Sequence, residues 1–437
     1  MKNAVLFGAS LFFYSWGEPL YVLLMMASIT SAFFFGFPIF HYRERNPRRA
    51  RLFVTLSVAV NLSALFFFKY YNFVASVAKL PKLAGLVLPI GISFYTFQIL
   101  SYTIDLYRGE IGLQRSFLAF GTYVTLFPQL VAGPIVKYSE IDRELTERAV
   151  TRSDLAHGIG RFVCGLAKKI LIGDALAMGF DYYKSALSLT PTVLGAWMIA
   201  VFYSLHLYYD FSGYSDMAIG LGRMFGFTFP ENFNYPYISK SIAEFWRRWH
   251  MTLSHWFRDY VYIPLGGNRR GLWRQCRNLM IVWLLTGLWH GAGWNFIIWG
   301  AYFGVLLIME RLFWGRILEK LPGALRHLYT LVLVFISFLI FSSDSLSFIG
   351  DCLKAMLGVG TVGFSAPILT YRLLRTLPLL AAAGVGATPL VMVRVRAFLQ
   401  KGSARWGLIP LGLALLLIAC VAYLADSTYS PFAYFNF

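Results

Sequence analysis

Apolar residues run through this chain in long blocks that short polar stretches separate. The blocks fall at 4–16, 20–40, 52–68, 86–106, 117–136, 158–180, 193–209, 211–229, 278–290, 294–310, 328–343, 365–386 and 408–425. Several are shorter than the ~20 residues a helix needs to cross about 30 Å of hydrocarbon, so they predict half-spans or re-entrant pieces. The pattern predicts an all-α polytopic membrane protein with roughly 10–12 transmembrane helices plus re-entrant and interfacial helices.

Composition strengthens this prediction, because only 14% of residues are charged and 58% are hydrophobic. A soluble protein carries about 25% charged residues. The first apolar block continues through Ser15-Trp-Gly-Glu-Pro19 into the next, which predicts no cleavable signal peptide. The loops are short, with no repeat and no low-complexity linker. We therefore expect one membrane domain over residues 1–437.

The formal net charge of +18 is concentrated between the apolar blocks, at 43–51, 240–277 and 394–405. This distribution is typical of cytoplasmic loops that face anionic lipid. It leaves no basic module outside the membrane, so we expect membrane lipid as a partner and no nucleic acid.

The segment at about 238–277 combines basic residues with many aromatic ones. Its apolar residues recur at helical spacing, namely Trp246, Trp249, Leu253, Trp256 and Tyr260. The spacing predicts an amphipathic helix at the cytoplasmic membrane surface. His250 falls at the edge of the apolar stripe and is expected to point inward, whereas His255 falls among the polar residues. The alternative for His250 is a packing role.

His290 lies in an apolar run, 279–309, that Gly291-Ala292-Gly293 interrupts. A charged side chain in the bilayer costs ~2.5–3.5 kcal/mol on insertion scales. A neutral imidazole avoids most of this cost and can also accept a proton. Glycine permits a helix break, and a break at membrane depth is tolerated beside a cavity, which Trp294 and Asn295 would flank with His290. The alternative is a buried histidine bound to a backbone carbonyl.

The remaining polar residues point less clearly to a catalytic role. Asp210 and Asp216 need partners at this depth, either to orient a histidine or in a structural role, which we favour. The four cysteines fit no disulfide or metal spacing, and the histidines show no metal motif. We therefore expect no metal.

Seven runs together resemble a known family. They are Leu88–Gln98, Phe127–Ile135, Asp210–Asp216, Asn232–Tyr237, Phe245–His250, Trp256–Tyr260 and Gly287–Gly291. They are similar to motifs of the membrane-bound O-acyltransferase (MBOAT) family, in order and most strongly over 86–300. The run Pro264–Arg269 resembles the bacterial alginate and peptidoglycan O-acetyltransferase branch. The likeness extends from Ser15–Pro19 to the aromatic tail at 432–437. Members of this family usually carry a further apolar segment before the part that matches Lys2–Pro19, which leaves the side of the N-terminus open.

The resemblance implies a ring of helices around a pinched tunnel in a bacterial inner membrane. It implies that His290 is the essential residue and His250 the second active-site histidine. Candidates to line the tunnel are Trp246, Asp210, Asp216, Trp289 and Asn295. Candidates to bind donor phosphates are Arg247, Arg248 and Arg269. No bound cofactor is implied. The donor substrate would be acetyl-CoA or another acyl thioester, and the partners an extracytoplasmic acetyltransferase-like or esterase-like protein and polysaccharide machinery.

The resulting hypothesis is acyl transfer from a cytoplasmic thioester toward an exported polysaccharide or cell-wall glycan. His290 would act as general base, a step typically worth ~10²–10⁴-fold. His250 would orient the donor or hydrogen-bond the developing oxyanion. Three alternatives stay open: a D-alanyl transferase for teichoic acid, a transporter or flippase with a proton relay, and a scaffold subunit without chemistry.

Overall fold

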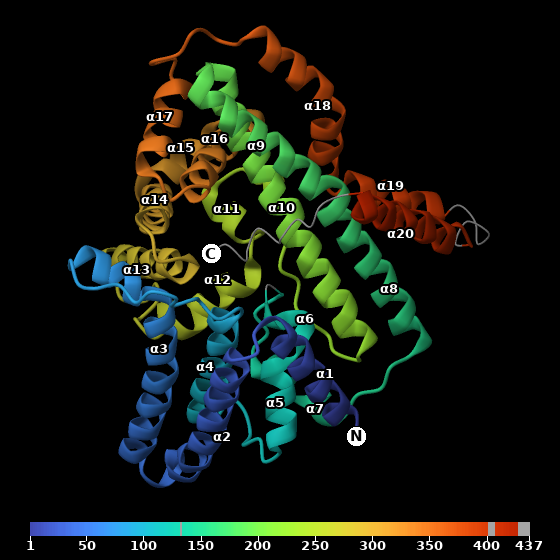
Figure 1. Ribbon diagram of the computed structural model, residues 1–437. Coiled ribbons are helices and arrows are strands. Elements are labelled where there is room, and N and C mark those ends of the chain that lie inside the picture. Colours follow the sequence, from blue (N-terminus) through green and yellow to red (C-terminus); the bar gives the residue numbers. More distant parts are fainter. Residues whose placement is uncertain (132, 401–406, 427–437) are drawn as a thin grey trace. The chain divides into compact units, whose positions relative to one another are not determined.

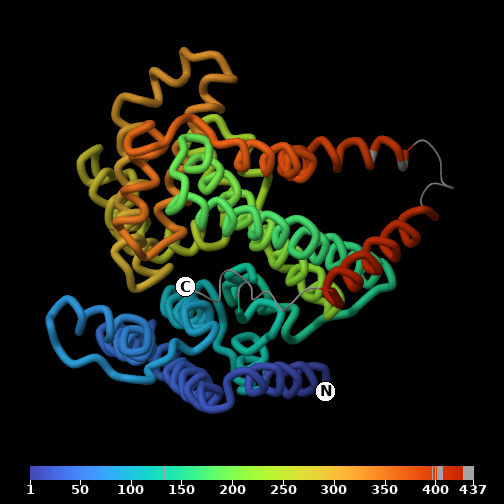
Figure 2. The backbone as a smooth tube through the Cα atoms, turned by 45° about the horizontal axis from the view of Figure 1, so that its top comes forward, coloured from blue at the N-terminus to red at the C-terminus, as the bar shows by residue number. Residues whose placement is uncertain are grey.

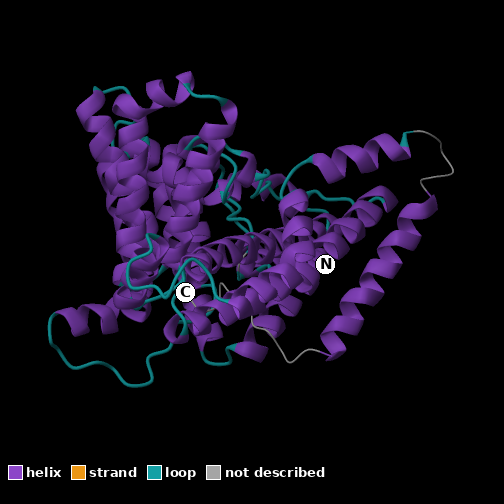
Figure 3. Ribbon diagram, turned by 90° about the horizontal axis from the view of Figure 1, so that it is seen from above, coloured by secondary structure: helices purple, strands orange, loops and turns teal. Residues whose placement is uncertain are grey.

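The computed structural model describes residues 1–131, 133–400 and 407–426, and all regular secondary structure in these ranges is helical (Figure 3). Six helical segments are long and apolar enough to cross a membrane: Tyr21–Arg45, Pro47–Val77, Trp294–Lys320, Gly323–Phe341, Pro367–Gly386 and Leu408–Asp426. The prediction of an all-α polytopic membrane protein is confirmed. The ring of helices around a tunnel stays a prediction, and the aromatic tail and part of the last basic loop lie outside the described residues.

The chain divides into two compact units, each built from discontinuous segments. Unit 1 comprises Met1–Ile159, Ala218–Glu231 and His255–Val261, and unit 2 comprises Gly160–Met217, Asn232–Ser254 and Tyr262–Phe437. Three of the five boundaries between the units fall inside α8 (Arg152–Ala167), α10 (Val193–Met224) and α12 (Met251–Phe257). A single domain over the whole chain stays a prediction.

Unit 1 is built mainly from the N-terminal helices. They are α1 (Lys2–Gly17), α2 (Tyr21–Arg45), α3 (Pro47–Val77), α4 (Ile92–Arg108), α5 (Phe117–Thr125), α6 (Phe127–Leu130) and α7 (Tyr138–Thr146). Helices α2 and α3 lie side by side (Figure 1). The turn between them is set by Asn46, whose side chain accepts a hydrogen bond from Arg49 N at 3.1 Å, and by Pro47 in the first turn of α3. Both features favour a helix start at this point.

Unit 2 holds both histidines of interest. Besides parts of α8, α10 and α12, it contains η1 (Lys168–Gly173), α9 (Asp174–Leu189), η2 (Pro236–Ile238), α11 (Ile242–Trp246), α13 (Leu272–His290), α14 (Trp294–Met309), η4 (Glu310–Trp314), α15 (Gly315–Lys320), α16 (Gly323–Phe341), α17 (Leu346–Met356), α18 (Pro367–Gly386), α19 (Leu390–Leu399) and α20 (Leu408–Asp426). The continuous run of α8, η1 and α9 lies along α10 (Figure 2). Gly165 and Gly213 allow this approach, since a Cβ on Gly165 would meet Gly213 O at 2.6 Å. Small residues at helix contacts are typical of membrane proteins.

Several element boundaries differ from the sequence-based prediction, and two of the differences concern segments that carry candidate site residues. The blocks 193–209 and 211–229 were expected as separate spans, but residues 193–224 form one helix, α10. The expectation failed because Asp210, which divides the two apolar blocks, forms an ion pair with Lys169 inside the protein and so does not interrupt the helix.

The amphipathic segment is also not one helix. Helix α11 ends at Trp246, residues 247–250 form a turn, and α12 begins at Met251 and continues into a π-helix, η3 (Arg258–Tyr262). His250 has φ +44°, which an α-helix does not allow, so α11 and α12 are not one continuous helix. Four of the five stripe residues are nevertheless buried as predicted: Trp246, Trp249, Leu253 and Trp256 are each at most 7% exposed, whereas Tyr260 is half-buried.

Candidate active site

The two histidines meet inside unit 2. Their ring centroids are 6.5 Å apart, and His250 is 1% and His290 6% exposed. A direct hydrogen bond between the rings is excluded, because it needs nitrogens about 3 Å apart and ring nitrogens lie too near their centroids to span 6.5 Å. The separation is suited to one small group between them. Two inward-facing histidines, as the sequence suggests, are therefore brought together.

The position of His290 follows from the glycines around it. His290 is the last residue of α13, and the extended backbone of Gly291 and Gly293 then leads into α14. The predicted break is confirmed. Farther back along α13, Gly287 lies against α14 so closely that a Cβ there would overlap Phe296 O. This contact fixes the pair of helices, and with it the end of α13 where His290 stands.

Aromatic rings hold the His290 imidazole. Trp289, Trp299 and Phe341 surround it at centroid distances of 5.0, 5.0 and 5.2 Å, all in edge-to-face geometry. Such pairs are worth ≈ 0.5–1.5 kcal/mol each beyond the area they bury. They fix the orientation of the ring.

A polar group holds the His250 ring instead. Its Nδ1 lies 3.0 Å from Oδ1 of Asn232, and Phe211 packs edge-on at 4.8 Å. His250 lies outside the six candidate spans, and burial lowers the pKa of its imidazole well below the usual value. The ring is therefore neutral. His255 is exposed on the same helix region, as predicted.

The tunnel candidates divide into two groups. Trp246, Trp289 and Asn295 are buried, and Trp246 contacts Trp283 and Phe303 at centroid distances of 4.4 and 4.8 Å. Trp289 lies 6.1 Å from His250 and so belongs to the surroundings of both histidines. Trp294 begins α14 and is 51% exposed, and its place beside a cavity stays a prediction.

Asp216 and Asp210 lie on α10 and interact with cations from α8 and η1. Asp216 Oδ1 accepts from Arg161 at 2.8 Å, and Asp216 Oδ2 lies 2.5 Å from Lys168 Nζ. Asp210 is 1% exposed with Lys169 Nζ at 3.8 Å. These ion pairs give both carboxylates a structural role, because they join the α8–η1 segment to α10. Lining of a tunnel by either residue stays a prediction.

The three donor-phosphate candidates differ in their surroundings. Arg247 and Arg269 are exposed, whereas Arg248 pairs with Glu244 at 3.1 Å and donates to Asn234 O at 3.1 Å. The guanidinium of Arg248 therefore stabilises the turn before His250. Of the three candidates, Arg247 and Arg269 are the two that are exposed to solvent.

Sequence reasoning assigned no role to Asn232, Ser215, Thr252 or His206. All four are buried: Asn232, Ser215 and Thr252 form one hydrogen-bonded group with His250, and His206 Nδ1 lies 2.9 Å from Gly173 O. The sequence did offer a signal for Asn232, because it is the first residue of the Asn232–Tyr237 run, which is rich in aromatic residues. For His206 the sequence offered only a lone histidine in an apolar block.

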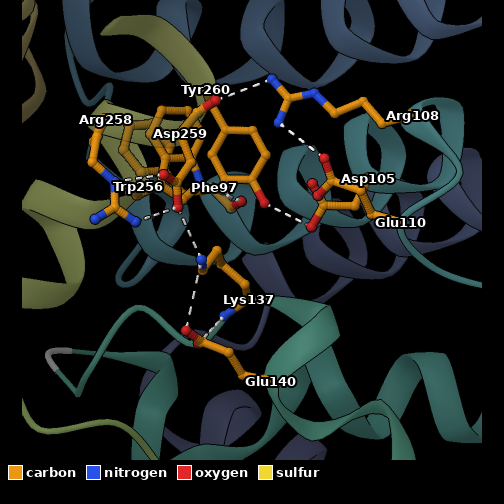
Figure 4. Close-up of polar contacts among 10 residues, drawn as sticks. All are labelled: Phe97, Asp105, Arg108, Glu110, Lys137, Glu140, Trp256, Arg258, Asp259 and Tyr260. Carbon is orange, nitrogen blue, oxygen red and sulfur yellow. Dashed lines mark hydrogen bonds and ion pairs between the residues drawn. The ribbon is translucent and has the colours of Figure 1, made fainter. Parts of the chain in front are cut away.

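In unit 1, the residues that follow His255 are anchored to α4 (Figure 4). Trp256 stacks on Phe97 with centroids 3.7 Å apart and donates from Nε1 to Phe97 O at 3.1 Å. Tyr260 donates to Asp105 Oδ2 at 2.7 Å. The aromatic motif at 256–260 is thus an anchor within this unit.

An ion-pair network adds to this anchor. Asp259 lies 3.1 Å from Lys137 Nζ and 2.7 Å from Arg258 Nε, and Lys137 also lies 3.8 Å from Glu140 (Figure 4). Burial alone would raise the pKa of Asp259, but the hydrogen bonds from Arg258 and Lys137 outweigh it and lower the pKa. Asp259 is therefore ionised at neutral pH.

Taken together, the helical spans and the pair of buried histidines define a multi-pass membrane protein with a candidate histidine active site. The family model of MBOAT, the membrane-bound O-acyltransferase family, matches residues 108–350, more than half of the chain and including both histidines. The chain therefore belongs to the membrane-bound O-acyltransferase family, and it is an acyltransferase.

Three bacterial relatives agree with this assignment. The chain is 42% identical to the probable alginate O-acetylase AlgI of Pseudomonas aeruginosa over 82% of this chain and 70% of the relative. It is 37% identical to the probable alginate O-acetylase AlgI of Pseudomonas putida over 100% of this chain and 94% of the relative. It is 36% identical to the peptidoglycan O-acetyltransferase of Helicobacter pylori over 81% and 73%. An inner-membrane location is consistent with these relatives.

Proposed function

We propose that this protein transfers an acetyl group from a cytoplasmic thioester donor, such as acetyl-CoA, across the membrane toward an exported polysaccharide or cell-wall glycan. The names of the relatives support the acetyl group and the class of acceptor. The single observation that carries the proposal is the pair of buried histidines with ring centroids 6.5 Å apart. A group of hydroxyl size fits that separation.

His290 acts as the general base in this proposal. The acceptor oxygen attacks the thioester carbonyl carbon while its proton passes to an imidazole nitrogen of His290. The tetrahedral intermediate then collapses, the carbon–sulfur bond breaks, and the proton moves from the imidazolium to the departing thiolate. General base catalysis of this kind contributes typically 10²–10⁴-fold. The aromatic contacts of His290 support the role, because they hold the imidazole in one orientation toward the space that His250 also faces.

The exposed arginines support a cytoplasmic donor. Arg247 and Arg269 present positive charge beside the predicted cytoplasmic segment, where the phosphates of a nucleotide thioester would be attracted. On the far side, an extracytoplasmic partner protein of acetyltransferase or esterase type would receive the acetyl group and complete its transfer to the polymer.

D-alanyl transfer to teichoic acid is the second candidate within the same chemistry. The run Pro264–Arg269 favours acetyl transfer, since it resembles the acetyltransferase branch and is not expected in the D-alanyl branch. A transporter without ester chemistry would leave the donor thioester intact, so a single assay separates it from both acyltransferase candidates.

The decisive experiment uses the full-length protein in lipid nanodiscs with acetyl-CoA labelled in the acetyl group and a hydroxyl-bearing glycan as acceptor. Release of free thiol and labelled product is measured for wild type, His290→Ala and the matched control His255→Ala, which alters an exposed histidine. We expect His290→Ala to lower the rate by about 10²-fold or more and His255→Ala to leave it unchanged. Wild-type turnover by a correctly folded His290→Ala protein would eliminate the assigned base.

A further inference from the structure

The Asn232 side chain is fully buried beside His250, and each of its polar atoms has a partner. Its Oδ1 lies 3.0 Å from His250 Nδ1, 2.9 Å from Thr252 Oγ1 and 3.4 Å from Thr252 N, and its Nδ2 donates to Ser215 Oγ at 3.0 Å. Because its oxygen accepts and its nitrogen donates, the buried Asn232 amide can adopt only one of its two flipped orientations.

These contacts determine which nitrogen of His250 carries the proton. The backbone N–H of Thr252 can only donate, so the atom it faces is the oxygen of the Asn232 amide. That oxygen can only accept, so His250 Nδ1 must carry the hydrogen. In a neutral imidazole the other nitrogen then has a free lone pair. Among the described residues, His250 Nε2 is buried without a hydrogen-bond partner.

The backbone around His250 is held as firmly as its ring. His250 has φ +44°, a left-handed conformation that costs of order 1–3 kcal/mol and persists only where the surroundings impose it. Two hydrogen bonds impose it here, from Asn234 N to Arg248 O and from Met251 N to Asn232 O, both at 2.9 Å. The segment that carries Asn232 therefore sets both the turn and the imidazole.

We propose that Asn232 is a positioning residue that fixes His250 as a hydrogen-bond acceptor, so that Nε2 binds an O–H or N–H group of the substrate between the two histidines. This inference rests on the proposed acyl transfer. It assigns His250 a role different from oxyanion stabilisation, because a nitrogen without hydrogen cannot donate to an oxyanion. The residues in ring contact with His250, namely Phe211, Trp289 and His290, carry no carboxylate that would stabilise its imidazolium.

Two substitutions of Asn232 separate positioning from simple structural support. Asn232→Ala removes the acceptor of Nδ1–H, and we expect kcat to fall about 10²-fold while KM for acetyl-CoA stays near the wild-type value. Asn232→Asp keeps an acceptor of the same shape, so most activity returns. Its negative charge stabilises the imidazolium, so the acid limb of the pH profile of kcat/KM moves to higher pH.

The matched control is Asn234→Ala, which changes an exposed asparagine in the same run and keeps the backbone bond to Arg248. It should match wild type in rate and in pH profile. An Asn232→Ala protein with unchanged kcat, or an Asn232→Asp protein with an unshifted pH profile, would overturn the inference.

A second readout does not depend on activity or on a stable Ala variant. The full-length protein is labelled with ¹⁵N-histidine in nanodiscs, and the His250 signals are identified by their loss in His250→Gln. We expect a neutral ring that is protonated at Nδ1 and bare at Nε2. The opposite tautomer would refute the role of Asn232, whereas the expected tautomer in a protein without acyl transfer would refute only the proposed function.

Discussion

His250 and His290 approach to 6.5 Å between ring centroids, with ring planes tilted by 57°, although they come from separate helical segments. His250 stands in the turn between α11 and α12, and His290 ends α13. Their supports differ in kind, because a buried amide orients the first ring and aromatic edges orient the second. Substitutions should therefore affect the two histidines differently.

The acceptor role of His250 predicts the effect of two replacements. His250→Ala removes the imidazole and should lower acyl transfer by about 10²-fold or more. His250→Gln offers an amide oxygen that can still accept, so it should retain more activity than His250→Ala. Rates of thiol release from acetyl-CoA measure both. A Gln variant no better than Ala would count against an acceptor function at this position.

The contact between α13 and α14 predicts a strong steric effect at Gly287. A Cβ there would overlap Phe296 O, so Gly287→Val must push the helices apart. Overpacking of this kind costs typically 1–3 kcal/mol, and we expect a lower melting temperature and reduced activity, since His290 ends the displaced helix. Gly384→Ala on α18 is the control, because a Cβ at Gly384 meets no atom within 4 Å. Equal melting temperatures for the two variants would contradict the packing argument.

The partly buried ion pairs of Asp216 should contribute more to the stability of the protein than an exposed ion pair. Asp216→Asn leaves Arg161 and Lys168 without their shared carboxylate, whose side chain is 17% exposed. The loss of stability should reach a few kcal/mol, discounted because both cations are about one-third exposed. The comparison is Asp351→Asn, which breaks an exposed pair with Lys354 and should cost no more than ~1 kcal/mol. Thermal unfolding in detergent measures both, and a larger effect at Asp351 would disprove the ranking.

The lowered pKa of Asp259 leads to a prediction of how the stability of the folded protein depends on pH. Its pKa is lower in the folded protein than in the unfolded chain, so the unfolded state binds more protons as the pH falls through the unfolded value of about 3.9. The contribution of Asp259 is therefore complete at neutral pH and disappears in acid. Asp259→Asn should lower the melting temperature at pH 7, and the difference from wild type should shrink below about pH 4. A difference that grows in acid would reverse the sign of this argument.

Some features could be predicted from the sequence because they depend on local pattern. The apolar blocks predict membrane helices, and Gly291 and Gly293 predict the break after His290. The periodicity of the segment around Trp246 predicts which side chains are buried, including the inward position of His250. It does not predict the turn at 247–250, because a hydrophobic stripe survives a short interruption that keeps the same side chains inward.

The sequence by itself determined the class of protein, its helices and the identity of the two histidines, because hydrophobic periodicity and motif order are properties of the chain alone. Only the tertiary structure decided what surrounds each imidazole. The bond between Asn232 and His250 joins segments on either side of α11, and the partners of Asp216 come from α8 and η1. Such contacts depend on how helices pack in three dimensions, and the pattern of any one segment does not specify them.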